Sequence, residues 1–374
     1  MINKKHLIYC FGSSILLACP WMGFAYGISI FFAFVPLLLI SEELRLLKPK
    51  NITFKFFIYS SLCFLLWNIL ATGWLAHATI PGAIVIILTN TVLYSLVFTA
   101  YSFTAYKFGN SGGFWAFVCF WTCFECFYTN AEISWPLLNL GGSLIHITKY
   151  IQWYEYTGSL GGSVWILTIN YIIFIIVKNL PLQIKSGLSL YAFLLIMIII
   201  PSTISLVLYY DYKEIKAPIN ITILQPNIDP QKEKFSLLTS SKQLDILLEL
   251  AKINGNTQTN YFLGPETSID NDIWENKPDN SESILRIRKF MGYYPHSYFI
   301  TGATTFYRYN NNEKLSVTAH LNKDGYYFDC FNTALQISQK GPIQIYHKSK
   351  LVVGVEKTPY PEIFHLISVY KKII

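Results

Sequence analysis

Hydrophobic residues dominate the first part of the chain, and polar residues alternate with apolar ones in the second. A helix needs about 20 largely apolar residues to cross a hydrocarbon core of about 30 Å. By this measure we expect about seven spans, at residues 6–19, 22–41, 53–72, 83–105, 113–130, 161–177 and 188–208. The pattern predicts a polytopic α-helical membrane domain over residues 1–210.

From residue 211 the pattern changes to short β-branched runs between amphipathic segments. It predicts strands at 219–225, 261–263, 297–304 and 326–338, and helices at 237–253 and 281–293. Strands alternating with helices indicate an α/β sheet, whose functional residues gather at the carboxyl ends of strands. We therefore expect residues 211–374 to form a water-exposed domain, and Glu266 follows one of its strands.

The two parts also differ in charge. Residues 1–208 contain ten Lys or Arg and five Asp or Glu, whereas the remaining 166 residues contain 19 and 17. Only 14% of the chain is charged, against about 25% in ordinary soluble domains. The net charge of +7 comes mainly from the membrane part, and no dense basic stripe is present. We therefore expect no nucleic-acid partner.

Basic residues also alternate from loop to loop. The loop at 73–82 has no Lys or Arg, and the long connection at 131–160 has only Lys149. The other loops carry Lys4, Lys5, Arg45, Lys48, Lys50, Lys107, Lys178 and Lys185. The positive-inside rule makes these cytoplasmic. With seven spans, the N-terminus is then cytoplasmic and the polar domain periplasmic or otherwise extracytoplasmic.

Some residues of the membrane part carry candidate chemistry. Glu125 lies within a predicted span, where an ionisable group indicates function by default, although near a helix end it can also form local hydrogen bonds. Trp135 and Trp153 lie in the aromatic 131–160 connection, which either covers a lipid site or anchors the chain at the interface. Three thiols share one helix face, at Cys119, Cys123 and Cys126. Because no His joins them, we expect apolar packing and no metal.

Six short motifs follow one another along the chain. Two lie in the membrane part: Trp121-x-x-x-Glu125, and Trp135-Pro136 followed by Leu140-Gly141. Four lie in the polar part: 223–228 (ILQPNI), 264–269 (GPETSI), 331–333 (FNT) and 346–352 (YHKSKLV). In this order the motifs resemble those of the apolipoprotein N-acyltransferases, a membrane branch of the carbon–nitrogen hydrolase (nitrilase) superfamily.

This resemblance implies a nitrilase-like α-β-β-α sandwich with a Glu–Lys–Cys site. Glu266 would be the general base, Lys348 would stabilise the oxyanion, and Glu356 would be a supporting carboxylate. The implied reaction is ping-pong transfer of an acyl chain from a membrane phospholipid to the N-terminal amine of a diacylglyceryl-cysteine lipoprotein. Trp135, Trp153 and Glu125 would contact lipid or substrate. The resemblance implies no cofactor, and places the protein in a bacterial inner membrane.

The nucleophile departs from the family pattern. The family Cys follows the Lys motif by several tens of residues, whereas the sequence shown continues only 26 residues beyond Lys348. Cys330 precedes the Phe-Asn-Thr motif and is not expected to replace it. The main hypothesis is therefore a truncated or split acyltransferase with a partial nitrilase-like domain. A second polypeptide would then supply the Cys.

Other interpretations stay open at this point. Taken singly, Glu266 is typical of a solvated loop and Lys348 of a basic surface. A non-catalytic membrane protein that binds lipids or lipoproteins is the alternative function. A transporter is less favoured, because the predicted spans contain almost no ionisable residue besides Glu125.

Overall fold

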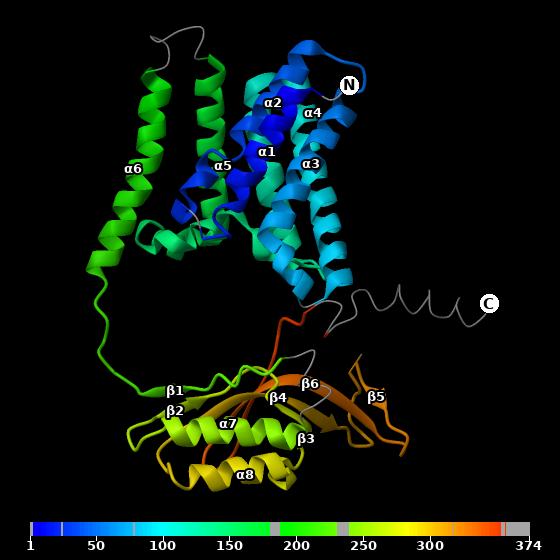
Figure 1. Ribbon diagram of the computed structural model, residues 1–374, viewed down its shortest axis with the longest axis vertical. Helices are drawn as coiled ribbons and strands as arrows, with labels where there is room; N and C mark the ends of the chain where they lie inside the picture. The colour runs from blue at the N-terminus through cyan, green and yellow to red at the C-terminus, as the bar shows by residue number, and fades with distance from the viewer. Residues whose placement is uncertain are drawn as a thin grey trace, which may run out of the picture. The chain divides into compact units, whose positions relative to one another are not determined.

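The computed structural model describes residues 3–23, 25–77, 79–179, 188–229, 239–316, 318–352 and 356. The chain divides into two compact units, Met1–Lys213 and Glu214–Lys357 (Figure 1). We call the first the membrane unit and the second the sheet unit. Lys185, one of the basic loop residues of the sequence analysis, lies outside the described residues.

The regular structure of the membrane unit is helical. Its α-helices are α1 (Lys4–Ala18), α2 (Val35–Leu47), α3 (Ile52–Thr72), α4 (Ile80–Asn130), α5 (Tyr154–Asn179) and α6 (Leu188–Asp211). Short 3₁₀ helices cover Ala25–Phe31, Gly73–His77, Pro136–Leu138 and Leu140–Tyr150. Five helices among the described residues are long and apolar enough to cross a membrane: Gly27–Leu47, Ile52–His77, Ile80–Asn130, Tyr154–Asn179 and Leu188–Asp211.

The difference between seven predicted spans and five long apolar helices has two sources. The first predicted span is α1, which has only 15 residues. The predicted spans at 83–105 and 113–130 form one run of 51 residues, α4. A straight helix of that length would measure about 76 Å, more than twice the hydrocarbon core. The run is interrupted at Gly109, whose φ of 71° is not helical. The count of seven spans stays a prediction.

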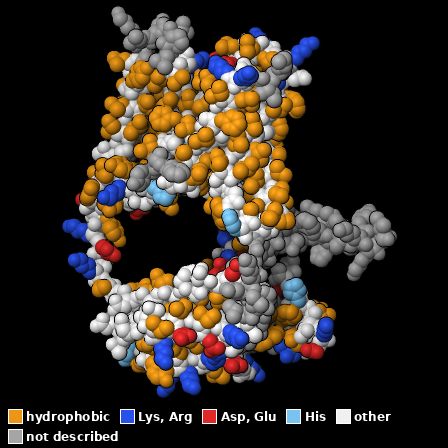
Figure 2. Space-filling view, in the orientation of Figure 1, with side chains coloured by type: hydrophobic (Ala, Val, Ile, Leu, Met, Phe, Trp, Pro, Cys, Tyr) orange, Lys and Arg blue, Asp and Glu red, His pale blue; other side chains and the backbone are white. Residues whose placement is uncertain are grey.

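Aromatic side chains form the centre of the membrane unit. Trp67, Phe98 and Trp121 are fully buried, and Tyr94 stacks on Trp121 with ring centroids 5.1 Å apart. Hydrophobic side chains also cover the flanks of the unit (Figure 2). Helix α6 has the most exposed apolar surface of the five long helices, because only 6% of its most apolar stretch is buried. Apolar side chains both inside and outside are typical of a structure whose solvent is lipid.

Charged side chains meet at one end of the membrane unit. Lys5 at the start of α1 pairs with Glu43 near the end of α2. Neighbouring Glu42 binds Lys178 at the end of α5, with 2.5 Å between nitrogen and oxygen. Lys178 also donates to the side chain of Asn110, next to the break in α4, over 3.1 Å. Four segments that carry basic residues therefore lie at the same end.

The sheet unit contains one mixed sheet and two helices. Its strands are β1 (Ile221–Ile223), β2 (Tyr261–Leu263), β3 (Ile269–Trp274), β4 (Tyr298–Arg308), β5 (His320–Leu321), β6 (Tyr327–Ile337) and β7 (Gln344–His347), and its helices are α7 (Ser240–Asn254) and α8 (Glu282–Met291). The strand order is β1-β2-β4-β6-β5, with β3 paired to β4 and β7 paired to β6. Strands β1, β2, β3 and β4 are parallel, and β4–β6 and β6–β7 are antiparallel.

Helices α7 and α8 cover one face of this sheet (Figure 1). Leu247 of α7 and Ile287 of α8 pack with Phe262, Phe299 and Leu335 of the strands, all nearly inaccessible to solvent. Ser281 starts α8 because its side chain accepts a hydrogen bond from the amide of Ile284, which satisfies a donor that the first turn leaves open.

The sequence predicted both helices of this unit and its strands β1, β2, β4 and β6. Strands β3, β5 and β7 were not predicted, and the predicted strands at 297–304 and 326–338 are β4 and β6, which pair antiparallel. The 223–228 motif lies mostly beyond β1, which ends at Ile223. The described residues form one sheet with helices on one face. The α-β-β-α sandwich therefore stays a prediction.

Candidate functional site: a carboxylate–lysine cluster

Glu266 lies where two short strands break along one edge of β4. Strand β2 pairs with the first residues of β4 and β3 with later ones, so both occupy the same edge. The backbone between them still bonds to β4 through Gly302, whose amide donates to the carbonyl of Pro265 over 3.0 Å. Thr267 has a φ of 50°, an uncommon conformation for a β-branched residue. The Gly-Pro-Glu motif therefore forms a tight bulge that presents Glu266.

A glycine on the neighbouring strand makes room for this bulge. A Cβ atom on Gly302 would lie 2.5 Å from the amide nitrogen of Thr267 and 2.6 Å from the Cα of Glu266. Both distances are far shorter than a van der Waals contact. Gly302 is thus a positional requirement for the site, and the sequence analysis did not single it out.

Lys348 reaches Glu266 from β6's side of the sheet, whereas Glu266 lies between β2 and β3, which pair with β4. Lys348 follows β7, and its amide donates to the carbonyl of Asn332 over 2.8 Å, which continues the ladder with β6. Its amine nitrogen lies 2.8 Å from Oε1 of Glu266 and 3.0 Å from Oε1 of Glu356. Residues 82 positions apart in sequence thus form one ion cluster.

Asn332 completes this cluster and was quoted in the sequence only as part of a motif. Its side-chain amide donates to Glu266 Oε1 over 2.7 Å and to Glu356 Oε1 over 2.6 Å. Glu356 also accepts from the amide of Val352 through its other oxygen. One amide and one ammonium therefore bridge the same two carboxylates. We call Glu266, Asn332, Lys348 and Glu356 the carboxylate–lysine cluster.

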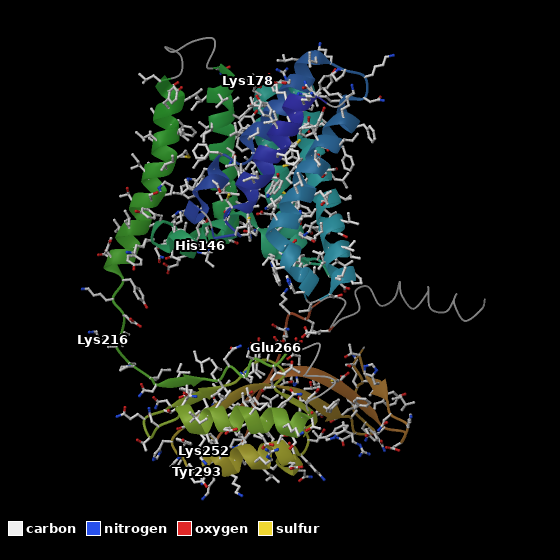
Figure 3. All side chains as sticks on the ribbon, in the orientation of Figure 1. His146, Lys178, Lys216, Lys252, Glu266 and Tyr293 are labelled. Atoms are coloured by element: carbon white, nitrogen blue, oxygen red, sulfur yellow. The ribbon has the colours of Figure 1, made fainter. Side chains whose placement is uncertain are left out.

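The cluster lies on the face of the sheet opposite α7 and α8. Successive residues of a strand point to opposite faces, and Thr333 and Leu335 of β6 are buried on the helix side. Asn332 directly precedes Thr333 in β6, so its side chain faces away from the helices. Figure 3 shows Glu266 on that same side of the sheet. This face is more exposed, so a substrate can approach the cluster.

His347, the neighbour of Lys348, belongs to a separate set of contacts. Its Nε2 lies 2.7 Å from Oε1 of Glu275, and its ring stacks on Phe331 with centroids 3.9 Å apart. Glu275 also accepts a hydrogen bond from the buried hydroxyl of Thr305. These contacts fix β7 against β6 and so hold the backbone from which Lys348 extends.

The charges of the cluster stabilise one another. Partial burial of the Lys348 amine acts to lower its pKa, but hydrogen bonds and charges from Glu266 and Glu356 outweigh burial and raise it. Partial burial of Glu356 acts to raise its pKa, but the Val352 amide, Lys348 and Asn332 lower it overall. At neutral pH the cluster therefore contains an ammonium ion and the Glu356 carboxylate.

Cys330 does not have the surroundings of a nucleophile. It directly precedes the Phe-Asn-Thr motif and lies inside β6, opposite Phe306. Burial and the charges of Asp270 and Asp329 raise the pKa of its thiol. A nucleophilic Cys needs the reverse, a nearby cation that lowers the pKa.

In the membrane unit, Glu125 holds a loop in place. Its side chain is buried, and Oε1 accepts hydrogen bonds from the indole of Trp121 and from the amide of Leu140, over 3.0 and 2.8 Å. Its other oxygen accepts from the side chain of Asn139 over 3.0 Å. These neutral donors come from one turn of α4 and from the connection at 131–160. Through these contacts Glu125 joins the end of α4 to the connection at 131–160.

The other predicted residues of the membrane unit are dispersed. The Trp153 ring packs edge-on against Trp165 with centroids 5.6 Å apart. The buried indole nitrogens of Trp135 and Trp153 have no hydrogen-bond partner among the described residues. Cys119, Cys123 and Cys126 are exposed free thiols. No group of three or more His, Cys, Asp or Glu in the described part of the chain is arranged to hold a metal ion.

Two comparisons relate this chain to known proteins. Residues 13–172 match the family model of the apolipoprotein N-acyltransferase N-terminal domain. The chain is also 24% identical over 342 residues to an apolipoprotein N-acyltransferase of Chlorobaculum tepidum. That alignment covers 89% of this chain, so it extends from the membrane unit into the sheet unit, and 61% of the relative.

The match therefore spans about three-fifths of the relative's length. The first match lies within the membrane unit, and the second extends into the sheet unit. The resemblance predicted from six motifs is confirmed: both matches show that this chain is similar to the apolipoprotein N-acyltransferases.

Proposed function

We propose that this protein is a membrane acyltransferase that moves an acyl chain from a phospholipid to the N-terminal amine of a diacylglyceryl-cysteine lipoprotein. The observation that carries the proposal is the carboxylate–lysine cluster, in which Lys348 lies within 3.0 Å of both Glu266 and Glu356. The similarity to a named apolipoprotein N-acyltransferase supports the substrate classes.

Glu266 acts as the general base in this proposal. Its side chain is 59% exposed, whereas that of Glu356 is 21% exposed and accepts a backbone amide. Of the two carboxylates, Glu266 is thus the one that a reacting group can approach, and Glu356 the one fixed in place. A base must come within hydrogen-bonding reach of the proton it removes, which favours Glu266 for proton transfer and Glu356 for support.

Lys348 stabilises the oxyanion. An ammonium group has three N–H donors, and two of them bind Glu266 and Glu356. The third is directed to neither carboxylate and is available to the carbonyl oxygen of a substrate. A fixed donor aimed at developing negative charge contributes about 10²–10³-fold in rate. Asn332 acts as a positioning residue, because it holds both carboxylates beside the amine.

The nucleophile of this reaction is a Cys thiolate. It attacks the ester carbonyl of the phospholipid, a C–S bond forms, and the ester C–O bond breaks as Glu266 returns the proton to the leaving alkoxide. The lipoprotein amine then attacks the thioester and frees the thiol. Residues 1–374 have no Cys at the family spacing, so we place it in a continuation of the chain or in a second polypeptide.

The proposal places the protein in a bacterial inner membrane, with its N-terminus cytoplasmic and the sheet unit periplasmic. Its support is the common end shared by Lys5, Arg45 and Lys178, because basic loops stay on the cytoplasmic side. The loop held by Glu125 lies at the opposite end of the membrane unit, near His146 (Figure 3).

The test uses protein isolated from its native membrane with whatever co-purifies, reconstituted in phospholipid vesicles with a diacylglyceryl-cysteine lipopeptide. Mass spectrometry measures the added acyl chain. We expect Glu266→Gln and Lys348→Gln each to lower the rate at least about 100-fold. Matched controls are Glu249→Gln on α7 and Lys350→Gln, two residues beyond Lys348, both exposed.

Wild-type rates in all four variants would contradict the proposal and favour the non-catalytic lipoprotein-binding alternative. The source of the nucleophile has its own measurement, the intact mass of the isolated protein. A mass well above 43.0 kDa assigns the Cys to a continuation of this chain. At 43.0 kDa it must come from a co-purifying polypeptide. The chain alone should then form no hydroxylamine-sensitive adduct with radiolabelled phospholipid.

A further inference from the structure

The sheet unit contains a second concave site, which the proposed acyl transfer does not use. A pocket of about 850 Å³ lies where β3 and β4 end beside the turn that enters β6. This volume is within the range of small-molecule sites, about 300–1,000 Å³. Its lining consists of three aromatic rings, two cations and four Asn side chains, and includes Trp274, Lys277, Asn280, Arg308, Asn311 and Tyr326. We call it the Trp274 pocket.

Aromatic packing gives the pocket a rigid wall. The Trp274 ring contacts Phe306, Tyr326 and Phe328, with centroids 5.4, 6.1 and 6.2 Å apart. The guanidinium of Arg308 lies over the Tyr326 ring, 4.2 Å from its centroid. This stacking leaves the N–H edge of the guanidinium directed away from the ring, where it can bind an anion through two bonds.

The backbone around Arg308 is fixed as well. The Asn276 side chain accepts from the amide of Arg308 over 2.8 Å and donates to its carbonyl over 3.2 Å. One side chain thus replaces a strand neighbour at the point where β3 ends. Because its frame is ordered before any ligand arrives, the pocket loses little entropy on binding.

Charge decides what this pocket can bind. Neither Lys277 nor Arg308 pairs with a carboxylate in the described part of the chain, and none of the nine lining residues is acidic. Nearby carboxylates bond elsewhere: Asp279 pairs with Arg288, and Glu313 binds the Tyr307 hydroxyl and Asn310. Two cations without counter-ions favour an anion, and Asn amides suit hydroxyl groups.

We propose that the Trp274 pocket binds a phosphate ester carried on a polyol or sugar. Arg308 and Lys277 bind the phosphate, the side-chain amides of Asn280 and Asn311 bind hydroxyls, and the ring of Trp274 covers the apolar side of the carbon chain. Arg308 lies four residues beyond Thr304, the β4 partner of Asn332, which is about 13 Å along the strand. The pocket is therefore separate from the carboxylate–lysine cluster, and this inference stands or fails independently of the acyl transfer.

The test measures binding of glycerol 3-phosphate to the full chain in neutral detergent by titration calorimetry. Arg308→Gln and Lys277→Gln should each weaken binding about tenfold or more, since each loses a charge-assisted hydrogen bond. Lys323→Gln, an exposed Lys in the turn before β6, is the matched control and should bind as wild type does.

Two further ligands sharpen the result. Glycerol should not bind measurably, and inorganic phosphate should bind more weakly than glycerol 3-phosphate. Repeating the titration in phosphatidylglycerol nanodiscs separates the sources. Weaker binding there identifies a lipid headgroup as the competing ligand, and unchanged binding identifies a soluble ester. No saturable binding by wild type, or equal binding by the Arg308→Gln/Lys277→Gln double variant, would overturn the proposal.

Discussion

Glu125 and Glu266 are both carboxylates that the sequence singled out, one in each unit, and their surroundings are opposite. Glu125 is 4% exposed and accepts its hydrogen bonds from neutral donors of α4 and of the following loop. Glu266 is largely exposed and pairs with the ammonium of Lys348. Glu125 therefore stabilises the position of a loop, whereas Glu266 belongs to a charged set that a substrate can reach.

This difference teaches how to interpret an acidic residue in a predicted site. A buried carboxylate whose oxygens are fully bonded to neutral donors cannot exchange protons readily without breaking those bonds. An exposed carboxylate held by a cation can do so while the cation stays in place. Variants that affect folding but not chemistry, or the reverse, can separate the two cases.

The largest expected effect is on the membrane unit. Glu125→Ala leaves the indole of Trp121, the amide of Leu140 and the side chain of Asn139 without their acceptor. We expect the free energy of unfolding to fall by about 3 kcal/mol or more, because each unsatisfied buried donor costs about 1–3 kcal/mol. Thermal unfolding in detergent measures it. Glu125→Gln should lose less, since an amide oxygen still accepts. An unchanged midpoint for Glu125→Ala would contradict a positioning role.

The second-largest effect is expected at Gly302, whose missing side chain leaves space for the bulge at Glu266. Gly302→Ala places a Cβ 2.5 Å from the amide of Thr267, so the bulge must shift. We expect a loss of about 1–3 kcal/mol in the stability of the sheet unit and a fall in acyl transfer, because Glu266 moves from Lys348. Gly12→Ala, whose Cβ would meet no atom within 4 Å, is the control. Wild-type activity in Gly302→Ala would show that Glu266 tolerates displacement.

A smaller effect is expected from Asn332. Asn332→Ala removes the amide that donates to both Glu266 and Glu356 and leaves Lys348 in place. Activity should fall about tenfold, in line with one or two lost hydrogen bonds to charged groups, with the pH profile of the rate shifted. Asn312→Ala, in an exposed loop, should behave as wild type. A loss of stability with an unchanged pH profile would indicate a merely structural role.

The smallest effect is the pH dependence of the cluster. The pKa of Glu356 lies below its ordinary 4.5, so its contribution to stability is present above pH 4.5 and is lost as pH falls through the lowered value. The pKa of Lys348 lies above its ordinary 10.5, so its contribution is present below pH 10.5 and is lost as pH rises through the raised value.

Both groups are partly exposed, so we expect about 1 kcal/mol or less from the pair. Hydrogen exchange of peptides that contain the Lys348 amide should show faster exchange in Glu356→Gln than in wild type at pH 7. The ratio should approach one as the pH falls through the lowered pKa of Glu356. A ratio that is constant with pH would mean that charge does not hold this segment.

Most of the long elements could be predicted from the sequence. The helices α3, α5 and α6 match predicted spans, and β4 and β6 begin within a residue of their expected starts. The family resemblance also selected three of the four residues of the carboxylate–lysine cluster, Glu266, Lys348 and Glu356. Strands β3, β5 and β7 escaped prediction, and for β3 the reason is physical. Strand β3 reads Ile-Asp-Asn-Asp-Ile-Trp, and its polar centre resembles a turn until β4 pairs with it.

The residues that complete the site were also missed for a reason. Gly302 matters only because another strand bulges against it, and Asn332 because two carboxylates converge on it. Neither environment exists in the local sequence. The same holds for the Trp274 pocket, whose cations come from segments more than 30 residues apart in the chain.

The sequence by itself determined the division between a lipid-facing and a water-facing part, because transfer of each segment between the two solvents depends on its own composition. It also determined the helices and long strands, whose periodicities are local. Only the tertiary structure decided which carboxylate would find a cation. For Glu266, that pairing depends on the register of β4, β6 and β7, which brings Lys348 within 2.8 Å. For Glu125, the packing of α4 against the following connection supplies only neutral donors.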